Sequence, residues 1–341
     1  MNILLTCAGR RNYLVDYFRS ALGVNGGRIL AADAQWTSPA IQEGDKSFLL
    51  PYVNEPSYLP KLLDICQQEE VTAIISLNDL ELPLLASHKK EFEQAGTAVL
   101  VSDPEVIDIC FDKWKTDIFF SRLGIRSPVT WLTVDKAKNA LSGGELSFPV
   151  VVKPRWGTAS VGIEFPEDMR ELELACELVR HKLMRTFLAD FSSTDKQHSV
   201  LIQQYLPGIE YGLDIVNDLQ GNYQATVVKQ KLAMRAGETD KAIVIDSPGL
   251  VSIGKKIATT LRHIANLDCD FFEHNGEFYG LEMNPRFGGG YPFSHMAGLD
   301  LPAAIVSWLG EAPVAEETFS VRFGTQTAKC DRLVNVESFQ V

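Results

Sequence analysis

Short apolar runs alternate with longer amphipathic stretches over the first part of the chain. Buried strands are expected at 2–6, 28–32, 73–77 and 98–101, and helices at 13–22, 56–69 and 80–94. Strands and helices that alternate at these lengths are typical of a parallel sheet covered by helices on both faces. The pattern therefore predicts a parallel α/β unit over residues 1–105.

The pattern changes after residue 105. The expected helices are at 112–123, 169–187, 251–265 and 302–309, and the expected strands at 148–153, 200–205, 211–217 and 223–231. The helix at 251–265 has an apolar residue at every third or fourth position, which indicates one core-facing side. We predict a second unit over 106–310, with a subdomain at 127–205. A C-terminal strand segment over 311–341 is expected to pack on it.

One expected strand carries most of the chemistry. Side chains alternate between the two faces of a strand, so Glu282 and Asn284 share one face and Met283 points away. Pro285 ends the strand pairing and leaves Arg286 at its mouth. Mg²⁺ prefers carboxylate and amide oxygens and keeps its other positions for water and phosphates. The segment therefore predicts a site for a magnesium–nucleoside triphosphate.

The turn that precedes this strand decides whether Asp270 belongs to the site. A two-residue turn at 275–276 would place Asp270 opposite Leu281, on the wrong face. A three-residue loop at 274–276, with its glycine left-handed in a bulge, would pair Asp270 with Gly280 and place it on the right face. We predict the three-residue loop and include Asp270 in the metal site.

A second group of residues suits phosphate binding. The buried strand at 148–153 ends in Lys153, and a loop of small residues follows that includes Gly157, Ser160 and Gly162. Backbone N–H groups of such a loop can approach phosphate oxygens closely. Together with the distant acidic strand, Lys153 is therefore predicted to be a phosphate ligand.

A strand end farther along the chain suits the base and the sugar of a nucleotide. Residues 203–208 end a strand in a Pro-Gly hinge, and Glu210 follows. Exposed backbone at such a hinge can pair with an adenine edge, and a nearby carboxylate can accept hydrogen bonds from ribose hydroxyls. The alternative is a plain loop between strands.

The turn after the first strand contains Gly9, Arg10 and Arg11. A dinucleotide fingerprint requires three glycines, so we exclude dinucleotide binding. Arg10 and Arg11 are either ligands for an anionic substrate group or solvated surface residues. Residues 249–256 imitate a P-loop, but Lys256 replaces the Ser or Thr that would bind Mg²⁺.

Composition and charge restrict the partners. The 341 residues are 45% hydrophobic and 22% charged, which is typical of a globular protein. The formal net charge of −12 repels nucleic acid and anionic membranes, so we expect neither as a partner. The six scattered cysteines indicate reduced thiols, and no signal peptide or membrane-spanning run is evident. These features indicate a cytoplasmic protein.

In this order, Lys153, the small-residue loop, the hinge and the Glu-Met-Asn-Pro-Arg segment resemble the ATP-grasp superfamily. The closest likeness is to single-module proteins similar to the large subunit of carbamoyl-phosphate synthase. The helix that opens with Asp112-Lys113 looks like the one that carries the first nucleotide lysine of the family. The resemblance covers essentially the whole chain. It implies a parallel α/β domain at 1–105 and an α/β (α+β) ATP-grasp module whose subdomain at 127–205 is a mobile lid.

The resemblance also implies roles for the matched residues. Lys113 and Lys153 would bind the α- and β-phosphates of ATP under the 156–162 loop, Gln203 and Leu206 would contact adenine, and Glu210 would contact ribose. Asp270, Glu282 and Asn284 would bind one or two Mg²⁺ (or Mn²⁺) ions, and Arg286, Lys231 and Arg235 would act on the transferring phosphoryl group or the acceptor. Substrate loops of such folds fall here around Arg10, Asn78-Asp79, Arg235 and 288–294, so substrate contacts are expected at Arg10, Arg11, Gly289 and Ser294.

The function that the resemblance implies is an ADP-forming ligase. A small-molecule carboxylate would attack the γ-phosphate of ATP, and an amine or a thiol would then displace phosphate from the acyl phosphate. Homodimers are common in the family. Gln204 stands where many members carry a glutamate, which weakens any side-chain role there. True carbamoyl-phosphate synthase joins two modules, which argues against carbamoyl phosphate synthesis by this chain alone. The alternatives are a kinase that stops at an acyl or carbamoyl phosphate and a non-catalytic ATP-binding protein.

Overall fold

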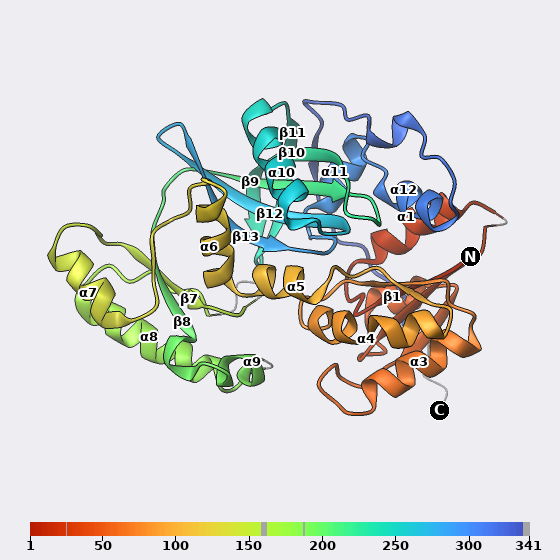
Figure 1. Ribbon diagram of the computed structural model, residues 1–341, viewed down its shortest axis with the longest axis horizontal. Coiled ribbons are helices and arrows are strands. Elements are labelled where there is room, and N and C mark those ends of the chain that lie inside the picture. The colour runs from red at the N-terminus through yellow and green to blue at the C-terminus, as the bar shows by residue number, and fades with distance from the viewer. Residues whose placement is uncertain (25, 158–161, 187, 337–341) are drawn as a thin grey trace.

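The computed structural model describes residues 1–24, 26–157, 162–186 and 188–336 (Figure 1). Its first unit is a five-stranded parallel sheet with the strand order β3-β2-β1-β4-β5, which confirms the predicted parallel α/β fold. Helices cover both faces, so the central strand buries its apolar side chains. The elements are β1 (Asn2–Thr6), α1 (Asn12–Leu22), β2 (Arg28–Asp33), α2 (Pro39–Glu43), β3 (Lys46–Leu49), α3 (Tyr58–Gln68), β4 (Ala73–Ser76), α4 (Leu82–Gln94) and β5 (Ala98–Val99).

Two helices lead from this unit to a small antiparallel sheet. In Figure 1, α5 and α6 lie between the first unit and the lobe that contains β7 and β8. The small sheet has the order β6-β8-β7, and α7 and α8 pack on it around one apolar cluster. The elements are α5 (Pro104–Phe111), α6 (Lys113–Arg122), β6 (Thr130–Trp131), α7 (Val134–Ser142), β7 (Val150–Pro154), α8 (Met169–Leu183), α9 (Ala189–Ser193), η1 (Lys196–His198) and β8 (Val200–Gln204).

A six-stranded antiparallel sheet forms the rest of the molecule, with the order β13-β12-β9-β10-β11-β14. Helix α10 packs against β9 and β10. The last strand, β14, joins the free edge of β11. The elements are β9 (Ile209–Asn217), β10 (Tyr223–Arg235), β11 (Glu238–Ile245), α10 (Pro248–Leu261), β12 (Ala265–His274), β13 (Glu277–Asn284), α11 (Tyr291–Ala297), α12 (Leu301–Leu309), η2 (Glu316–Phe319) and β14 (Gln326–Ala328).

The hairpin of β12 and β13 has a two-residue turn, so the predicted three-residue loop is wrong. His274 pairs with Glu277, and Asn275 and Gly276 between them have φ angles of 52° and 76°. Two consecutive positive φ angles define the type I′ turn, whose twist matches that of the strands, and Asn-Gly is its preferred sequence. The local turn chemistry therefore decides the loop length.

A bulge restores the register that the shorter turn would have lost. Phe271 pairs with Gly280, whereas the next pair is Asp270 with Glu282, so Leu281 is an extra residue on β13. A single extra residue reverses the facing of everything beyond it. Asp270 therefore lies directly opposite Glu282, and the expectation that a two-residue turn would remove it from the site is wrong.

Other differences from the sequence prediction lie at element ends. Helix α10 ends at Leu261 instead of continuing to residue 265, because Arg262 adopts a left-handed φ of 54°. Helix α8 ends at Leu183, before the expected residue 187. The helices α2, α7 and α11 and the strands β3 and β11 were not expected.

A shared apolar core joins the first unit to the six-stranded sheet. Phe18 of α1 meets Phe287 edge-on with ring centroids 5.9 Å apart, and Phe287 meets Tyr291 at 4.7 Å. All three rings are buried. This packing places the segment that follows β13 beside the first unit. Within the described ranges, no helix is long and apolar enough to cross a membrane.

Candidate active site

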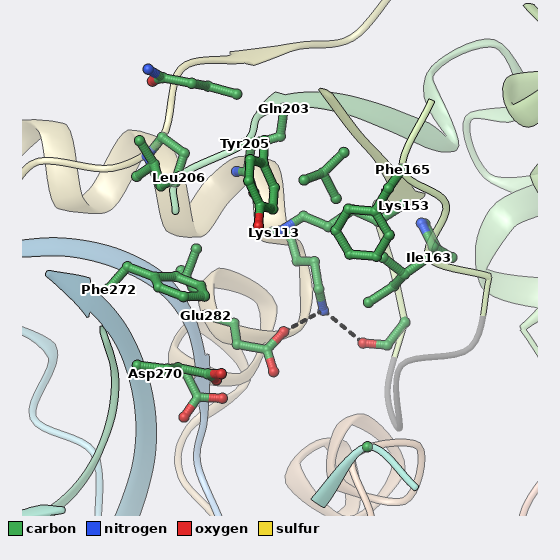
Figure 2. A pocket seen from close by; sticks show the side chains of 18 of the residues that line it. Lys113, Lys153, Ile163, Phe165, Gln203, Tyr205, Leu206, Asp270, Phe272 and Glu282 are labelled. Atoms are coloured by element: carbon green, nitrogen blue, oxygen red, sulfur yellow. Dashed lines mark hydrogen bonds and ion pairs between the residues drawn. The ribbon is translucent and has the colours of Figure 1, made fainter. Parts of the chain in front are cut away.

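A pocket of about 270 Å³ opens between the small sheet and the β12–β13 hairpin (Figure 2). Its apolar lining includes Val151, Ile163, Phe165, Leu206, Phe272 and Leu281, and its charged lining consists of Lys113, Lys153, Glu210, Asp270 and Glu282. An apolar slot with charged groups beside it suits a ligand that has a flat ring and a polyanionic tail. We refer to it as the first pocket.

Two lysines reach the first pocket from different elements. Lys113 begins α6, and its Nζ lies 3.1 Å from Oε2 of Glu282 and 2.7 Å from the carbonyl oxygen of Gly157. Lys153 in β7 is 6% exposed, yet its ammonium makes no hydrogen bond or ion pair with any residue that the structure describes. Burial and the charge of Lys113 lower the pKa of Lys153 to about 8, although Glu282 and Asp117 oppose this shift. Lys153 is therefore available to an anionic ligand.

Three oxygen-bearing side chains share one face of the hairpin. Asp270 lies opposite Glu282, and Asn284 lies opposite Asp268 one step along the ladder. Burial alone would raise the pKa of Glu282, but the lysines of the site, led by Lys113, lower it to about 2. Glu282 is therefore ionised at neutral pH and balances the lysine charges.

These oxygens suit a hard divalent cation. Mg²⁺ takes few protein ligands and completes its shell with water and phosphate oxygens. Among the residues that the structure describes, no three His, Cys, Asp or Glu side chains form a metal cluster by themselves. The donor set of Asp270, Glu282 and Asn284, with lysines beside it, fits an ion that arrives with a nucleotide better than a resident metal centre.

Lys231 bridges the acids of the first pocket. Its Nζ lies 2.7 Å from Oδ1 of Asp270 and 2.6 Å from Oε1 of Glu210. Burial opposes the charged form of Lys231, but the two acids together raise its pKa. Lys231 is therefore a fixed positive charge between the expected metal site and the expected ribose site.

Arg286 is buried and held by two acids. Its Nε and Nη2 lie 2.9 and 2.7 Å from the two carboxylate oxygens of Asp79, which follows β4 of the first unit. Its Nη1 lies 3.4 Å from Oδ2 of Asp268. A bidentate arginine–carboxylate pair fixes the plane of the guanidinium. The orientation of Arg286 is therefore set from outside its own strand.

Asp268 is a site residue that sequence reasoning missed. It lies two residues before Asp270, so strand alternation places both on one face, which was the available signal. Burial and the charge of Asp270 raise the pKa of Asp268 to about 7, against the effect of Arg286 and Lys229. Its carboxylate lies against Gly288, where a Cβ atom would come within 2.1 Å of Oδ2.

A second, polar pocket of about 120 Å³ adjoins the first and shares Asp270 and Glu282 with it. Arg11, Glu238, Arg286 and Gly289 line it as well. We refer to it as the polar pocket. Arg11 and Gly289 are thus brought to the site, as expected for substrate contacts, although their roles stay predictions.

A buried polar network supports one wall of the polar pocket. The ammonium of Lys229 contacts the carboxylate of Asp214, which also accepts a hydrogen bond of 2.5 Å from Ser294 and one of 3.0 Å from Asn266. Ser294 is fully buried behind this network. The structure therefore gives Ser294 a supporting position, and it does not line the polar pocket.

Two further expected residues are not brought to either pocket. Arg235 lies at the end of β10, where it pairs with Asp331 at 2.7 Å and with Asp240 at 2.9 Å. Arg10 is 79% exposed and reaches Asp331 at 3.4 Å. Both arginines are absent from the linings of the first and polar pockets and pair with acids at the surface instead. Ser160 lies outside the described residues.

Three of the remaining residues that are expected to contact a nucleotide line the first pocket. Gln203 and Leu206 line it, and Nε2 of the buried Gln203 donates to Oγ1 of Thr130 at 2.8 Å. Gly157 lines it too, and Gly162 adopts a φ of 75°, which favours glycine. Their contacts with a nucleotide stay predictions.

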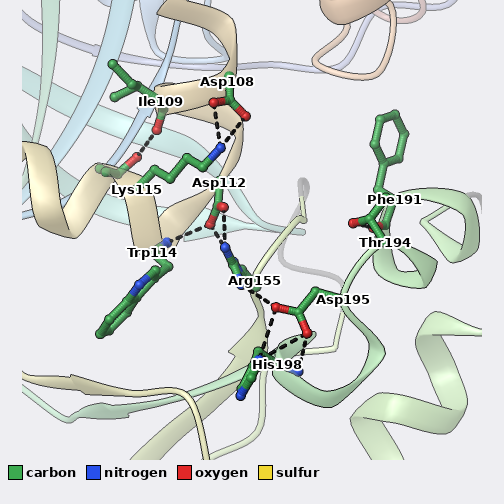
Figure 3. Close-up of polar contacts among 11 residues, drawn as sticks. Asp108, Ile109, Asp112, Trp114, Lys115, Arg155, Phe191, Thr194, Asp195 and His198 are labelled. Atoms are coloured by element: carbon green, nitrogen blue, oxygen red, sulfur yellow. Dashed lines mark hydrogen bonds and ion pairs between the residues drawn. The ribbon is translucent and has the colours of Figure 1, made fainter. Parts of the chain in front are cut away.

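An ion-pair network ties the start of the glycine loop to α6 (Figure 3). Nε and Nη2 of Arg155 each lie 2.7 Å from a carboxylate oxygen of Asp112, and Nη1 lies 3.2 Å from Asp195. Asp112 also caps α6, because its side chain accepts a hydrogen bond from the N–H of Trp114. Arg155 thus fixes the segment that carries Lys113 to the segment that follows Lys153.

Comparisons with known proteins match both units. Residues 3–100 match the family model of a PylC-like N-terminal domain, and residues 196–331 match that of an ATP-grasp in the biosynthetic pathway with Ter operon. The carbamoyl phosphate synthase large chain of Helicobacter pylori is 26% identical over 263 residues, which are 74% of this chain and 23% of the relative. The chain thus spans about a quarter of the length of the curated relatives that it matches.

Solved structures share the fold. The biotin carboxylase domain of Hydrogenobacter thermophilus 2-oxoglutarate carboxylase superposes with a TM-score of 0.74 at 16% identity, covering 95% of this chain and 73% of that one. An L-amino acid ligase from Bacillus licheniformis gives 0.70 at 17% identity, covering 90% and 75%. These likenesses concern the fold alone. Together with the sequence matches, they show that the chain carries an ATP-grasp domain behind a PylC-like N-terminal domain and is homologous to the carbamoyl phosphate synthase large chain.

Proposed function

We propose that this protein is an ATP-dependent ligase that joins a carboxylate to an amine or a thiol and releases ADP and phosphate. One observation carries the proposal: Lys153, a buried lysine without a partner in the described chain, lines one pocket together with Asp270 and Glu282. A triphosphate with its divalent ion satisfies both kinds of group at once, because phosphate oxygens take the lysine and the ion takes the acids.

The pocket supports a nucleotide in its other parts as well. Its apolar walls suit a purine ring, and Glu210, which contacts Lys231, lines the same pocket. Asp270, Glu282 and Asn284 would hold one or two Mg²⁺ or Mn²⁺ ions. The bound metal supplies neutralisation of the phosphate charge. A biotin carboxylase domain of the same fold was solved with MgADP and bicarbonate, which supports this use of the site.

The proposed reaction has two displacement steps. A carboxylate oxygen bonds to the γ-phosphorus while the bond from that phosphorus to its bridging oxygen breaks, so that ADP leaves and an acyl phosphate remains. The amine nitrogen then bonds to the acyl carbon, the carbon–oxygen bond to phosphate breaks, and the nitrogen loses a proton. Arg286, held by Asp79, and Lys231 provide fixed positive charge where the transferring oxygens gain negative charge.

A kinase that stops at the acyl or carbamoyl phosphate is the second candidate, and homology to the carbamoyl phosphate synthase large chain favours it. It shares the first displacement and lacks the second. Release of phosphate that depends strictly on an amine separates the two functions.

We also infer a homodimer, since the biotin carboxylase domain of similar fold is a dimer. Light scattering of the purified chain tests this assembly.

The function is tested by a screen of carboxylates against amines for ADP release. For any active pair, a carboxylate labelled with heavy oxygen should transfer one label to the released phosphate. The Lys153→Met variant should lose turnover with that pair, whereas Lys255→Met, on the exposed side of α10, should keep it. Binding of Mg·ATP without turnover of any pair would instead indicate a nucleotide-binding protein that is not an enzyme.

A further inference from the structure

The inner cations of the polar pocket each contact an acid within the protein. Lys229 contacts Asp214, and Arg286 contacts Asp79. Lys231 is shared by two acids of the first pocket. Internal pairs of this kind fix the orientation of these cations in the wall. The head group of a substrate can therefore be recognised by lining residues outside these pairs, such as Arg11 and Glu238.

Arg11 is a lining cation without an acidic partner. It is the N-cap residue of α1 and donates from Nη1 to the backbone carbonyl of Leu77. It forms no ion pair within the described part of the chain, and its Nε is buried with no hydrogen-bond acceptor. A buried donor without an acceptor costs free energy. An anionic group in the polar pocket would give the Arg11 guanidinium the acidic partner that it lacks.

Glu238 is a lining acid that already accepts an ammonium. It begins β11, and a Cβ atom at Gly289 would lie 3.0 Å from its Cδ, so the glycine gives the carboxylate room. Lys329, which follows β14, places its Nζ 3.0 Å from Oε2 of Glu238. Burial would raise the pKa of Glu238, but Lys329 and Arg11 lower it, so the side chain is ionised. The Glu238 side chain is also half exposed and thus open to exchange.

The C-terminal segment that provides Lys329 also carries an acid. Asp331 lies two residues after Lys329 and holds Arg235 at 2.7 Å and Arg10 at 3.4 Å. Exposed ion pairs of this kind contribute about 0–1 kcal/mol each and exchange readily. The pair of Lys329 with Glu238 is likewise at the surface and can exchange with a ligand ammonium.

We propose that the polar pocket binds a substrate with an amino acid head group, whose carboxylate pairs with Arg11 and whose ammonium pairs with Glu238. The proposal deepens the ligase function and rests on it for its meaning, but binding can be measured without turnover. Arg11 and Glu238 line only the polar pocket and not the first pocket. The head group is thus held outside the nucleotide pocket, with the shared acids Asp270 and Glu282 between the two ligands.

Binding is tested by calorimetry on the full chain with magnesium and a non-hydrolysable ATP analogue. The common amino acids are titrated one at a time, in L and D forms. The tightest ligand is then compared with its amide, which lacks the carboxylate, and with its N-acetyl form, which lacks the ammonium. Each blocked form should bind about tenfold more weakly or worse, which is the loss expected for one charged hydrogen-bonded contact.

Variants assign the two contacts. Arg11→Gln should weaken binding of the amino acid but not of its amide, and Glu238→Gln should weaken binding of the amino acid but not of its N-acetyl form. Arg19→Gln, on the same helix but outside the pocket, should bind like the wild type. Retained binding of the ATP analogue shows that each variant is folded.

Two results would overturn the proposal: no amino acid binds, or blocking either charge leaves the affinity unchanged. These results are distinct from failure of the ligase function. If an amino acid binds as described but no pair of carboxylate and amine causes ADP release, the proposed ligase function is wrong and the assignment of the polar pocket stands. If other carboxylates and amines are turned over but no amino acid binds, the ligase function stands and the assignment of the polar pocket is wrong.

Discussion

The buried positive charge of Lys153 lowers the stability of the folded protein. Its pKa is lowered to about 8, so between that pH and the ordinary lysine value of about 10.4 the unfolded chain binds more protons than the folded one. Stability from this residue therefore rises with pH across that window. Below it the folded state carries a buried ammonium that Glu282 and Asp117 compensate only in part. A residue that disfavours folding and faces a pocket indicates a role in binding.

Replacing Lys153 should separate stability from binding. Lys153→Met removes the buried charge and keeps the length of the side chain, so the free energy of unfolding at neutral pH should stay equal or increase. Affinity for Mg·ATP should fall about tenfold or more, because a charged hydrogen bond to phosphate is lost. Urea denaturation and calorimetry measure the two effects, with Lys255→Met as the control. Unchanged affinity would contradict the assignment.

Nucleotide affinity should also depend on pH. As the pH rises through about 8, the unliganded protein loses the proton of Lys153 that a phosphate requires, so affinity should decrease. Titrations of a non-hydrolysable analogue across this range measure the effect. The decrease should vanish in Lys153→Met. A wild-type profile that stays flat would be inconsistent with this role.

Arg286→Ala should affect turnover far more than nucleotide binding. Arg286 is expected at the transferring phosphoryl group, where an arginine can contribute about 10³-fold to kcat. The Kd of the ATP analogue should change little, since Lys113 and Lys153 remain. The variant also leaves Asp79 and Asp268 without their cation, which should reduce stability by about 3 kcal/mol. Single-turnover kinetics on folded protein at low temperature, with Arg286→Lys as comparison, measure the split.

Sequence patterns identified side chains better than their partners. The face shared by Glu282 and Asn284 follows from strand alternation alone, and the structure keeps it. The partner of Arg286 does not follow from any local pattern, because Asp79 lies in another unit. Arg235 and Arg10 looked like substrate ligands because no local signal shows the acid at Asp331 that holds them.

At the scale of elements, the β12–β13 hairpin shows why register is hard to predict. Asn275-Gly276 fixed the turn, but the bulge at Leu281 changed the facing of the strand beyond it. A bulge depends on what packs on both faces of a strand, and no residue type announces it reliably. The predicted loop was one residue too long and the predicted strand lacked the bulge, and these two errors cancelled. Asp270 and Glu282 therefore share one face as predicted, although the predicted loop is wrong. The strands and helices of the first unit could be predicted, because short apolar runs alternate there with longer amphipathic stretches.

Arg155 links two elements that we propose to contact the nucleotide, α6 and the strand that ends at Lys153. Arg155→Gln should raise the KM for ATP about tenfold, because α6 and the strand that ends at Lys153 lose their bidentate link. It should also reduce stability by about 3 kcal/mol, since Asp112 is left buried without its cation. Steady-state kinetics and urea denaturation measure both effects. Arg155→Lys should recover part of the KM, and no recovery would indicate a merely structural role.

At the scale of the whole molecule, one apolar core spans the first unit and the six-stranded sheet. Phe287→Ala should therefore destabilise the protein by about 3–5 kcal/mol, the usual cost of deleting a buried ring. Unfolding should remain a single transition because both units share this core. Denaturation followed by fluorescence and by circular dichroism measures it, and Phe323→Ala, at an exposed site, serves as control. Separate transitions for the two probes would contradict the shared core.

The bidentate pair of Asp79 and Arg286 crosses the boundary between the two units. Proteins of this architecture can diversify by recombination, in which one gene segment is exchanged for that of a distant cousin. A chimaera that received a foreign first segment would keep the residues that we propose to bind the nucleotide, because they belong to the second segment. The guanidinium of Arg286 would still lose its fixed orientation unless the donor segment also supplied an acid after its fourth strand. That single carboxylate therefore limits which gene fusions can yield a working catalyst.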